Sequence, residues 1–425
     1  MKQRKTFVAM AFIGLVLSVT SCSVQRSSSS SQNTSGTSVS HSGSSSDASM
    51  SLPSNIAVAD VTWMDMITGP NSINQTNLGY DVGGTDLGIP FYNSNNDTMY
   101  LAFGDTFSHN DFSGNWRSNV LAKSTDYDLS DGLVIDDFIT NPNGIAIPMI
   151  DGLHNFGYET TKIPTGGIEI FGTLYMFYFS IKQWEPNEMN YGGVVKSNDN
   201  GETWSRVYDL SWCTQVSGGY SANIQALVNQ DSNFTNGVGN VNISTHYAPS
   251  FSQIYPIDGK DGYVYILGEG NYRAEGIKMG RVLYENFEHF EDYEYFRGFE
   301  NDEAVWVKGS AGLITIEQSL GNYVIDDYCS EQSIMYNEYL GKWMVTYLRN
   351  FGEGIVYRTA SAIWGPYSDA ETMLPYSYPF ANQGNGIYGG FVHEKYTEQN
   401  GKIIYFILSQ WTPVYNSSYV KVAFE

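Results

Sequence analysis

The stretch GYDVGGTDLGIPFYNSNNDTMYLAFGDTF, residues 79–107, contains the structural unit that the rest of the chain repeats. LGIPFYN (Leu87 to Asn93) and TMYLAFG (Thr98 to Gly104) have the composition of two strands joined by a tight polar turn. An antiparallel hairpin returns the chain to the edge of the sheet from which it started. Asp86, just before the first strand, and Asp105, just after the second, are therefore expected at the same end of the sheet.

Two carboxylates at one opening suit acid–base chemistry on a glycosidic bond. A simpler interpretation is that Asp86 and Asp105 are turn residues at Gly-rich corners, a common role for Asp beside Gly. Repetition of the same hairpin further along the chain favours the first interpretation.

Five segments share the pattern of a polar turn followed by an aromatic-rich strand, and they are spaced sixty to ninety residues apart. They are NNDTMYLAFGDT, FGTLYMFYFS, KDGYVYILGEG, YLGKWMVTYLR and QNGKIIYFILS, starting at residues 95, 171, 260, 339 and 399. Long helical periodicity is absent from the sequence. These features predict an all-β protein, a five-bladed β-propeller with about four strands in each blade.

The last blade has only three candidate strands of its own, GIYGGFVHEK, KIIYFILSQW and YVKVAFE. A three-stranded blade would leave an unpaired edge, which propellers avoid. The segment VADVTWMD, Val58 to Asp65, is expected to supply the fourth strand. The last blade would then be closed by an N-terminal strand.

The first residues have the features of a targeting segment. Three of the first five residues are basic, and the apolar run Phe7 to Val19 is too short to span a bilayer. The run ends in a segment resembling the lipobox of bacterial lipoproteins, so residues 1–22 are predicted to be a signal peptide with Cys22 lipidated. Residues 23–50 are Ser-rich and predict a flexible tether, which leaves 51–425 as the propeller catalytic domain. We expect export and lipid anchoring to the bacterial membrane, at the outer membrane or cell surface if the cell is Gram-negative.

The amino-acid composition indicates which class of molecule the protein binds. A formal net charge of −23 disfavours nucleic acid and other polyanions, whereas 32 Tyr, 22 Phe and 9 Trp suit a neutral polysaccharide. Membrane contact is expected through the lipid anchor only. Cys213 and Cys329 lack the spacing of a metal or redox motif, and the sequence leaves open whether they form a disulfide. No dinucleotide, P-loop or zinc motif occurs, so no cofactor and no catalytic metal are predicted.

Two segments in the middle of the chain have a more structural character. SNDNGETW, residues 197–204, matches the Asp-box pattern, in which Asp199 and Gly201 form a tight turn and Trp204 packs between blades. The uneven stretch from Thr203 to Ser250 is rich in Asn, Ser and Gly and is expected to form one wall of the cleft.

The propeller arrangement predicts that several acids share one funnel. The starts of innermost strands and the ends of second strands lie on one face, so Asp86, Asp105, Glu269 and Glu331 should all point toward it. Like charges in one cleft raise each other's pKa values, which allows one carboxyl to stay protonated as an acid. Alternatively, some of these acids hold a structural cation in the central channel or pair with arginines. The side chains expected to bind substrate or assist at the same opening are Arg273, Tyr388, His393 and Trp411, together with Glu269 and Glu331.

The motifs GYDVGGTDLGIPF, YLAFGDTF, LGEGNYR, SEQSIMYNEYLGKWMVTY, YRTASAIWGPYS and ILSQWTPVY together resemble a known family. This is the domain of unknown function 4185, also classed as glycoside hydrolase family 183, whose members are five-bladed propeller endo-D-arabinanases acting on the arabinan of mycobacterial cell walls. The resemblance covers roughly residues 58–425. It implies that Asp86 and Asp105 are the catalytic pair and that Glu331 is a further site residue.

The resulting hypothesis is a glycoside hydrolase that cleaves internal α-D-arabinofuranosyl linkages of arabinan, of the arabinogalactan or lipoarabinomannan type. Inversion of the anomeric carbon is favoured, and which Asp is the acid stays open. Two rival hypotheses are a non-catalytic glycan-binding lipoprotein and a glycosidase acting on another neutral glycan such as L-arabinan.

Overall fold

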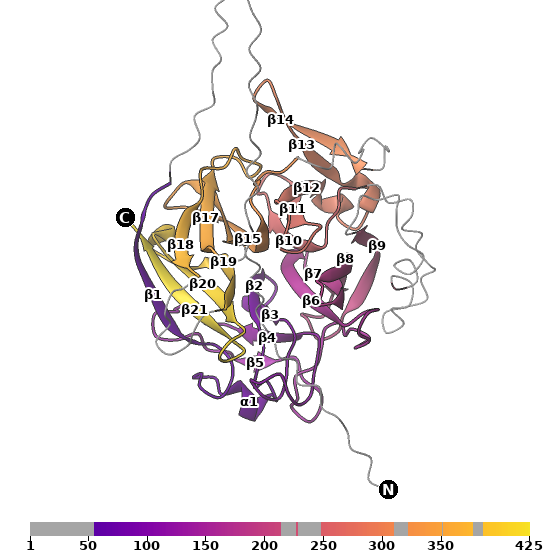
Figure 1. Cartoon of the computed structure of the whole chain (residues 1–425), viewed down its shortest axis with the longest axis vertical. Coiled ribbons are helices and arrows are strands. Elements are labelled where there is room, and N and C mark those ends of the chain that lie inside the picture. Colours follow the sequence, from indigo (N-terminus) through magenta and orange to yellow (C-terminus); the bar gives the residue numbers. More distant parts are fainter. Residues whose placement is uncertain (1–54, 214–226, 228–247, 310–321, 351, 377–385) are drawn as a thin grey trace, which may run out of the picture. The chain divides into compact units, whose positions relative to one another are not determined.

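The computed structural model describes residues 55–213, 227, 248–309, 322–350, 352–376 and 386–425. In these ranges the chain forms five antiparallel sheets arranged around a common axis (Figure 1). The innermost strand of each sheet contacts the innermost strands of the two neighbouring sheets, so the ring is closed. The prediction of an all-β, five-bladed propeller is confirmed.

The strands follow the chain blade by blade. Blade one holds β2 (Leu87–Asn93), β3 (Thr98–Phe103), β4 (Val120–Ser124) and β5 (Asp137–Phe138). Blade two holds β6 (Thr161–Ile170), β7 (Thr173–Gln183), β8 (Glu188–Ser197) and β9 (Ser205–Cys213). Blade three holds β10 (Gln253–Asp258), β11 (Tyr263–Glu269), β12 (Lys278–Leu283), β13 (Glu294–Glu300) and β14 (Glu303–Lys308). Blade four holds β15 (Cys329–Asn337), β16 (Lys342–Arg349), β17 (Gly354–Ala360) and β18 (Glu371–Pro375). Blade five holds β19 (Ile387–Glu398), β20 (Ile403–Gln410), β21 (Asn416–Phe424) and β1 (Val58–Met66). The short α-helix α1 (Thr76–Gly79) precedes blade one.

Three of the innermost strands contain a proline. Pro90, Pro164 and Pro256 lie within β2, β6 and β10, each of which has a single paired neighbour in its sheet. A proline lacks the N–H that a central strand needs, so it is tolerated only on such an edge. These residues therefore suit the side of the blade that faces the central axis.

The N-terminal strand closes the last blade as predicted. β1 pairs antiparallel with β21, from Val58 opposite Phe424 to Met66 opposite Ser418. The backbone N–H of Glu425 also donates to the carbonyl of Ala57 at 3.1 Å. In Figure 1, β1 lies along the outside of blade five beside the C-terminus.

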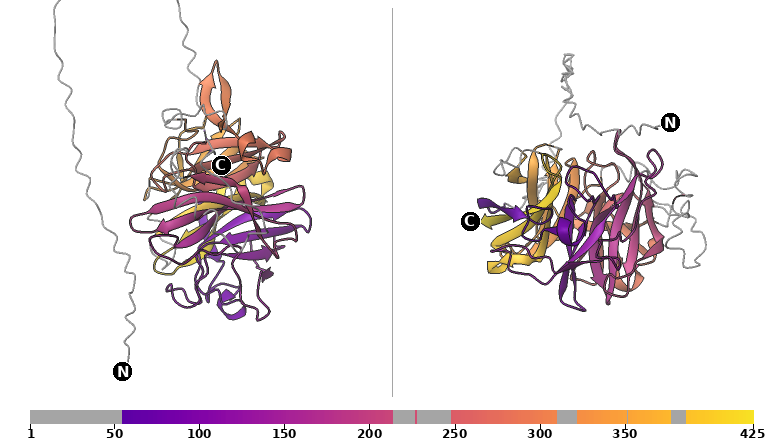
Figure 2. Two further views of the ribbon diagram at one scale, coloured as in Figure 1. Left: turned by 90° about the vertical axis from the view of Figure 1, so that its right-hand side faces the viewer. Right: turned by 90° about the horizontal axis from the view of Figure 1, so that it is seen from below.

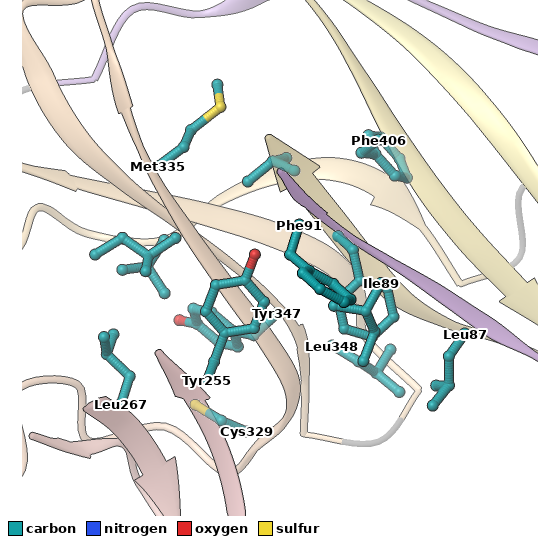
Figure 3. Close-up of a cluster of buried hydrophobic side chains, with 14 of the residues drawn as sticks. Leu87, Ile89, Phe91, Tyr255, Leu267, Cys329, Met335, Tyr347, Leu348 and Phe406 are labelled. Atoms are coloured by element: carbon teal, nitrogen blue, oxygen red, sulfur yellow. The ribbon is translucent and has the colours of Figure 1, made fainter. Parts of the chain in front are cut away.

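A continuous apolar cluster fills the space between the blades. Figure 3 shows side chains from four blades in this cluster: Leu87, Ile89 and Phe91 from β2, Tyr255 and Leu267 from blade three, Cys329, Met335, Tyr347 and Leu348 from blade four, and Phe406 from β20. All are at least 95% buried. Cys329 is a free thiol, so it forms no disulfide. The near-continuous apolar strands in the sequence are explained by packing on both of their faces.

The Asp-box forms the turn between β8 and β9. Asp199 accepts hydrogen bonds from the backbone N–H of Thr203 at 2.9 Å and from the hydroxyl of Ser197 at 2.7 Å. Gly201 takes a φ of +82°, and its carbonyl accepts from the indole of Trp204 at 3.0 Å. Trp204 packs against the core cluster, as expected for this motif.

Some expectations differ from the structure in detail or lie outside it. Blade three has a fifth strand because β13 turns back into β14, and this hairpin projects outward (Figure 1, Figure 2). β5 is only two residues long. The predicted signal peptide with Cys22, the tether and most of the expected cleft wall lie outside the described residues. Within the described ranges, no helix is long and apolar enough to cross a bilayer.

Deleting residues 51–66 should strongly destabilise the domain, because β21 would lose its partner strand and blade five would have an open edge. We expect the melting temperature to fall by about 10 °C or more. Deletion of residues 23–50 serves as the control and should leave the melting temperature unchanged. Equal melting temperatures for the two deletions, measured by differential scanning calorimetry, would contradict the closure.

Candidate active site

All five innermost strands begin at the same face of the propeller, which we call the strand-start face. Asp86 immediately precedes β2, Thr161 starts β6 and Gln253 starts β10. Glu331 and Tyr388 are near the starts of β15 and β19. Residues far apart in the sequence therefore meet on one surface.

The β2–β3 hairpin brings Asp86 and Asp105 to the same end of its sheet. Gly84 bridges Phe107, and the N–H of Gly104 donates to the carbonyl of Asp86 at 3.1 Å. A Cβ at position 104 would lie only 2.2 Å from Oδ1 of Asp86, so this position admits only glycine while Asp86 keeps its place. This confirms the expectation from the hairpin that the two acids share one end.

The carboxyl of Asp86 is largely removed from water and lies near the charge of Asp105. Tyr388 donates its hydroxyl to Oδ2 at 2.7 Å, whereas Oδ1 is buried without a hydrogen-bond partner among the described residues. Desolvation by burial raises the pKa of Asp86 to about 7 against the opposing effects of Tyr388 and Tyr415, and the charge of Asp105 raises it further. Asp86 therefore keeps a proton well above the usual range of an Asp.

Asp105 has a different set of neighbours. Its Oδ1 accepts from the indole of Trp116 at 2.8 Å and from the hydroxyl of Thr161 at 2.6 Å. Burial raises the pKa of Asp105 to about 6, and these two donors and the nearby His154 oppose that rise. Since donors stabilise the ionised form, Asp105 loses its proton before Asp86.

Glu331 forms an ion pair with Arg273, whose guanidinium lies over the ring of Tyr388. Its Oε1 accepts from Arg273 Nη2 at 2.7 Å and from the hydroxyl of Tyr272 at 3.0 Å. The guanidinium carbon of Arg273 lies 4.7 Å from the ring centre of Tyr272 and 5.3 Å from that of Tyr388. Glu331 has a φ of +43° at a bulge in β15, a strained conformation that occurs often at functional sites. Through Tyr388 this group is connected to Asp86.

Glu269 is fully buried, and neither of its carboxyl oxygens has a hydrogen-bond partner among the described residues. Burial raises its pKa well above the usual value, and the charge of Glu275 adds to the rise. Folding therefore favours the neutral form of this carboxyl. The alternative of pairing with an arginine is confirmed for Glu331, which binds Arg273, but not for Glu269, since Arg349 pairs with Asp327.

The structure places the two remaining predicted side chains, Trp411 and His393, at different parts of blade five. Trp411 follows β20 at the strand-start face, where its backbone N–H donates to the carbonyl of Gly386 at 3.2 Å. His393 lies further along β19, and the neighbouring Glu394 pairs with Lys260 in the β10–β11 turn at 2.8 Å. That turn is at the opposite end of the sheet from Glu269, so the structure does not bring His393 to the acids. Burial lowers the pKa of His393 to about 4, which keeps the ring neutral.

Several site residues escaped sequence analysis. They are Trp116, Thr161, Tyr272 and Tyr415, which contact Asp105 or Glu331, and His154, which pairs with Asp151 at 3.0 Å. Tyr272 and Tyr415 lie within the motifs LGEGNYR and ILSQWTPVY but were not singled out, whereas Trp116, Thr161 and His154 stand in no motif of recognisable spacing. Among the described residues, no group of three or more His, Cys, Asp or Glu side chains is arranged to hold a metal ion, so the idea of a channel cation gains no support.

Comparison of the sequence with known families gives a match to "Domain of unknown function (DUF4185)" over residues 71–421. The chain belongs to this family. No curated protein sequence matches it.

Several solved structures are similar to this DUF4185 chain at low sequence identity. An exo-β-1,3-galactanase from Phanerochaete chrysosporium is 12% identical with a TM-score of 0.43, over 86% of this chain and 63% of the galactanase, less than two thirds of its length. The arabinanase of Bacillus subtilis is 13% identical with a TM-score of 0.40, over 80% of this chain and 96% of that chain. A family 43 glycoside hydrolase from Xanthomonas citri complexed with xylose is 9% identical with a TM-score of 0.43, over 80% and 87%.

Glu269→Gln should reduce the loss of stability at rising pH. A carboxyl whose pKa is raised by folding stabilises the fold fully below its unfolded pKa of about 4.3, and this contribution is lost as pH rises toward the folded pKa. Between the unfolded and the folded pKa, the wild-type protein should therefore lose about 1.4 kcal/mol per pH unit that the variant does not lose. Urea unfolding of both proteins between pH 5 and 8 measures the difference.

The matched control is Glu338→Gln, at an exposed position on blade four. Its stability should follow the wild-type pH dependence. A Glu269→Gln variant with that same pH dependence would show that Glu269 is ionised in the folded protein.

Proposed function

We propose that this chain is a glycoside hydrolase that cleaves internal α-D-arabinofuranosyl linkages of a neutral arabinan, with Asp86 as general acid and Asp105 as general base. The observation that carries the proposal is the placement of two carboxyls at one end of the β2–β3 hairpin with pKa values of about 7 and about 6. Between these values one carboxyl is protonated and the other ionised. That is the pairing that glycoside hydrolysis requires.

Asp86 suits the role of acid because its environment favours the neutral form. Burial and the charge of Asp105 raise its pKa, and protonation relieves both costs. In the reaction it would give its proton to the glycosidic oxygen as the bond to the anomeric carbon breaks. The hydroxyl of Tyr388 fixes the carboxyl by holding Oδ2, so Oδ1 is the oxygen available for the transferred proton.

Asp105 suits the role of base because two donors hold its Oδ1. These bonds orient the carboxylate and keep it ionised at a pH where Asp86 is not. In the reaction Asp105 would take a proton from water as the water oxygen bonds to the anomeric carbon. Proton balance is complete, since Asp86 regains a proton from solvent and Asp105 releases one.

Arg273 and Glu331 support this pair as positioning groups. Arg273 lies against the ring of Tyr388, which in turn holds Asp86, and Glu331 fixes Arg273 by charge. Oε2 of Glu331 is buried and has no hydrogen-bond partner among the described residues, so it is an unused acceptor at the site.

The substrate assignment rests on the family resemblance together with the composition. A formal charge of −23 suits a neutral glycan better than an acidic one. A lipidated Cys22 followed by a Ser-rich tether would hold the domain at the bacterial surface, within reach of such a polymer.

Asp86→Asn and Asp105→Asn should each lower kcat/KM on arabinogalactan by roughly 10²–10⁴-fold, the usual contribution of one acid or base. The wild-type pH profile should be bell-shaped with its maximum between about 6 and about 7. Activity falls at low pH as Asp105 gains a proton and at high pH as Asp86 loses one. Asp86→Asn should remove the alkaline limb, and Asp105→Asn the acidic limb.

The control is Asp97→Asn, at the turn that forms the other end of the same hairpin. Asp97 has a φ of +51°, which Asn also tolerates, so this variant should keep wild-type turnover. L-arabinan is assayed in parallel, and cleavage of L-arabinan alone would contradict the substrate assignment. A wild-type protein that binds glycan without turnover would instead support the glycan-binding alternative.

The stereochemical outcome should be inversion, so the first product of an α-linkage should be β-configured. This expectation requires the carboxyl groups to be on the order of 6.5–9.5 Å apart in the complex, which leaves room for the water. Retention would need about 5–5.5 Å and a carboxylate nucleophile. The anomeric NMR signal recorded before mutarotation decides, and an α-configured first product would point to a covalent glycosyl-enzyme.

A further inference from the structure

Two loops beside Asp105 carry several aromatic side chains, of which the proposed mechanism uses only Trp116, as a donor to Asp105. One loop, residues 104–119, joins β3 to β4, and the other, residues 139–160, joins β5 to β6. Both lie at the strand-start face. We call four of their rings the aromatic platform: Phe107, Phe112, Trp116 and Phe156.

The platform is a continuous row of rings. Phe107 and Trp116 are stacked with their centroids 6.0 Å apart and their planes 16° from parallel. Phe156 also stacks on Trp116, with the centroids 6.0 Å apart and the planes at 30°. Phe112 meets Phe107 edge-on at 5.8 Å. The row therefore extends across both loops.

Much of this apolar surface is open to solvent. Phe112 is 42% exposed and Phe156 is 57% exposed. Ten large apolar side chains are exposed in the part of the chain that the structure describes, and three of them, Phe112, Leu153 and Phe156, belong to these two loops. Such a concentration of exposed apolar side chains marks a binding surface.

The platform is fixed in position relative to the proposed base. The indole N–H of Trp116 donates to Oδ1 of Asp105 at 2.8 Å, and the Trp116 ring lies 4.2 Å from that of His154. At the other end of the row, Phe112 packs 4.3 Å from Tyr415, whose hydroxyl donates to the carbonyl of Asp105 at 2.9 Å. A molecule bound on the rings is therefore held at a set place beside Asp105.

We infer that the aromatic platform binds successive sugar residues of an extended glycan on the Asp105 side of the linkage that is cut. This inference rests on the proposed function and adds which surface holds the polymer beyond the scissile bond. A sugar ring has an apolar C–H face that packs on an aromatic ring while its hydroxyls stay in water. A protein partner bound to the same rings would instead block the access of substrate to Asp105.

The test compares Phe112→Ala, Phe156→Ala and the double variant with Phe171→Ala. Phe171 is a matched control because it is 80% exposed and lies in the β6–β7 turn, at the opposite end of its sheet from Thr161. The probes are D-arabinan and an α-linked arabinofuranose disaccharide. We expect the ratio of kcat/KM on polymer to that on disaccharide to fall about tenfold or more in the double variant, and to keep its wild-type value in Phe171→Ala.

Retardation in a native gel containing D-arabinan gives a readout independent of turnover. It should weaken in Phe112→Ala and Phe156→Ala and stay unchanged in Phe171→Ala. Loss of retardation together with an inactive wild-type protein would support the platform and contradict the proposed hydrolysis. Equal retardation and equal ratios in all variants would overturn the platform, and hydrolysis by the wild-type protein would still stand. A wild-type protein that is neither retarded nor selective for polymer would also overturn the platform.

Discussion

Closure of the ring by β1 and β21 is the constraint on which the site depends. The candidate site takes a side chain from every blade: Asp86 and Asp105 from blade one, Thr161 from blade two, Arg273 from blade three, Glu331 from blade four and Tyr388 from blade five. Each contact joins two different sheets, for example Thr161 to Asp105 and Tyr388 to Asp86. An open ring would let the sheets move apart and would break these contacts first.

Burial at the centre of the ring supplies the chemistry. Asp86, Asp105 and Glu269 all have raised pKa values with desolvation as the largest cause. What distinguishes them is the set of donors: Asp105 has two strong donors on one oxygen, Asp86 leaves one oxygen unpartnered, and Glu269 leaves both. Different numbers of donors in similar burial separate the pKa values, and this separation gives the two catalytic carboxyls different roles.

Much of the fold could be predicted from the sequence because its signals are local or periodic. The hairpin around Asn95 has a turn and two short apolar strands, and its recurrence indicated the number of blades. The missing fourth strand of blade five was predicted from Val58 to Asp65, and the structure places β1 at Val58–Met66. The fifth strand of blade three was missed, since EAVWVK, residues 303–308, carries no sign of belonging to a blade that was already complete.

The sequence by itself determined that Asp86 and Asp105 share one end of a sheet, because strand length and turn position dictate which residues an antiparallel hairpin brings together. Only the tertiary structure decided which groups surround them. Thr161 is 56 residues from Asp105 and Tyr388 is 302 from Asp86, and no local pattern encodes contacts of that range. For the same reason His393, expected at the opening, lies toward Lys260 instead. The order of the pKa values follows from such long-range neighbours and from burial, so it became visible only in the folded chain.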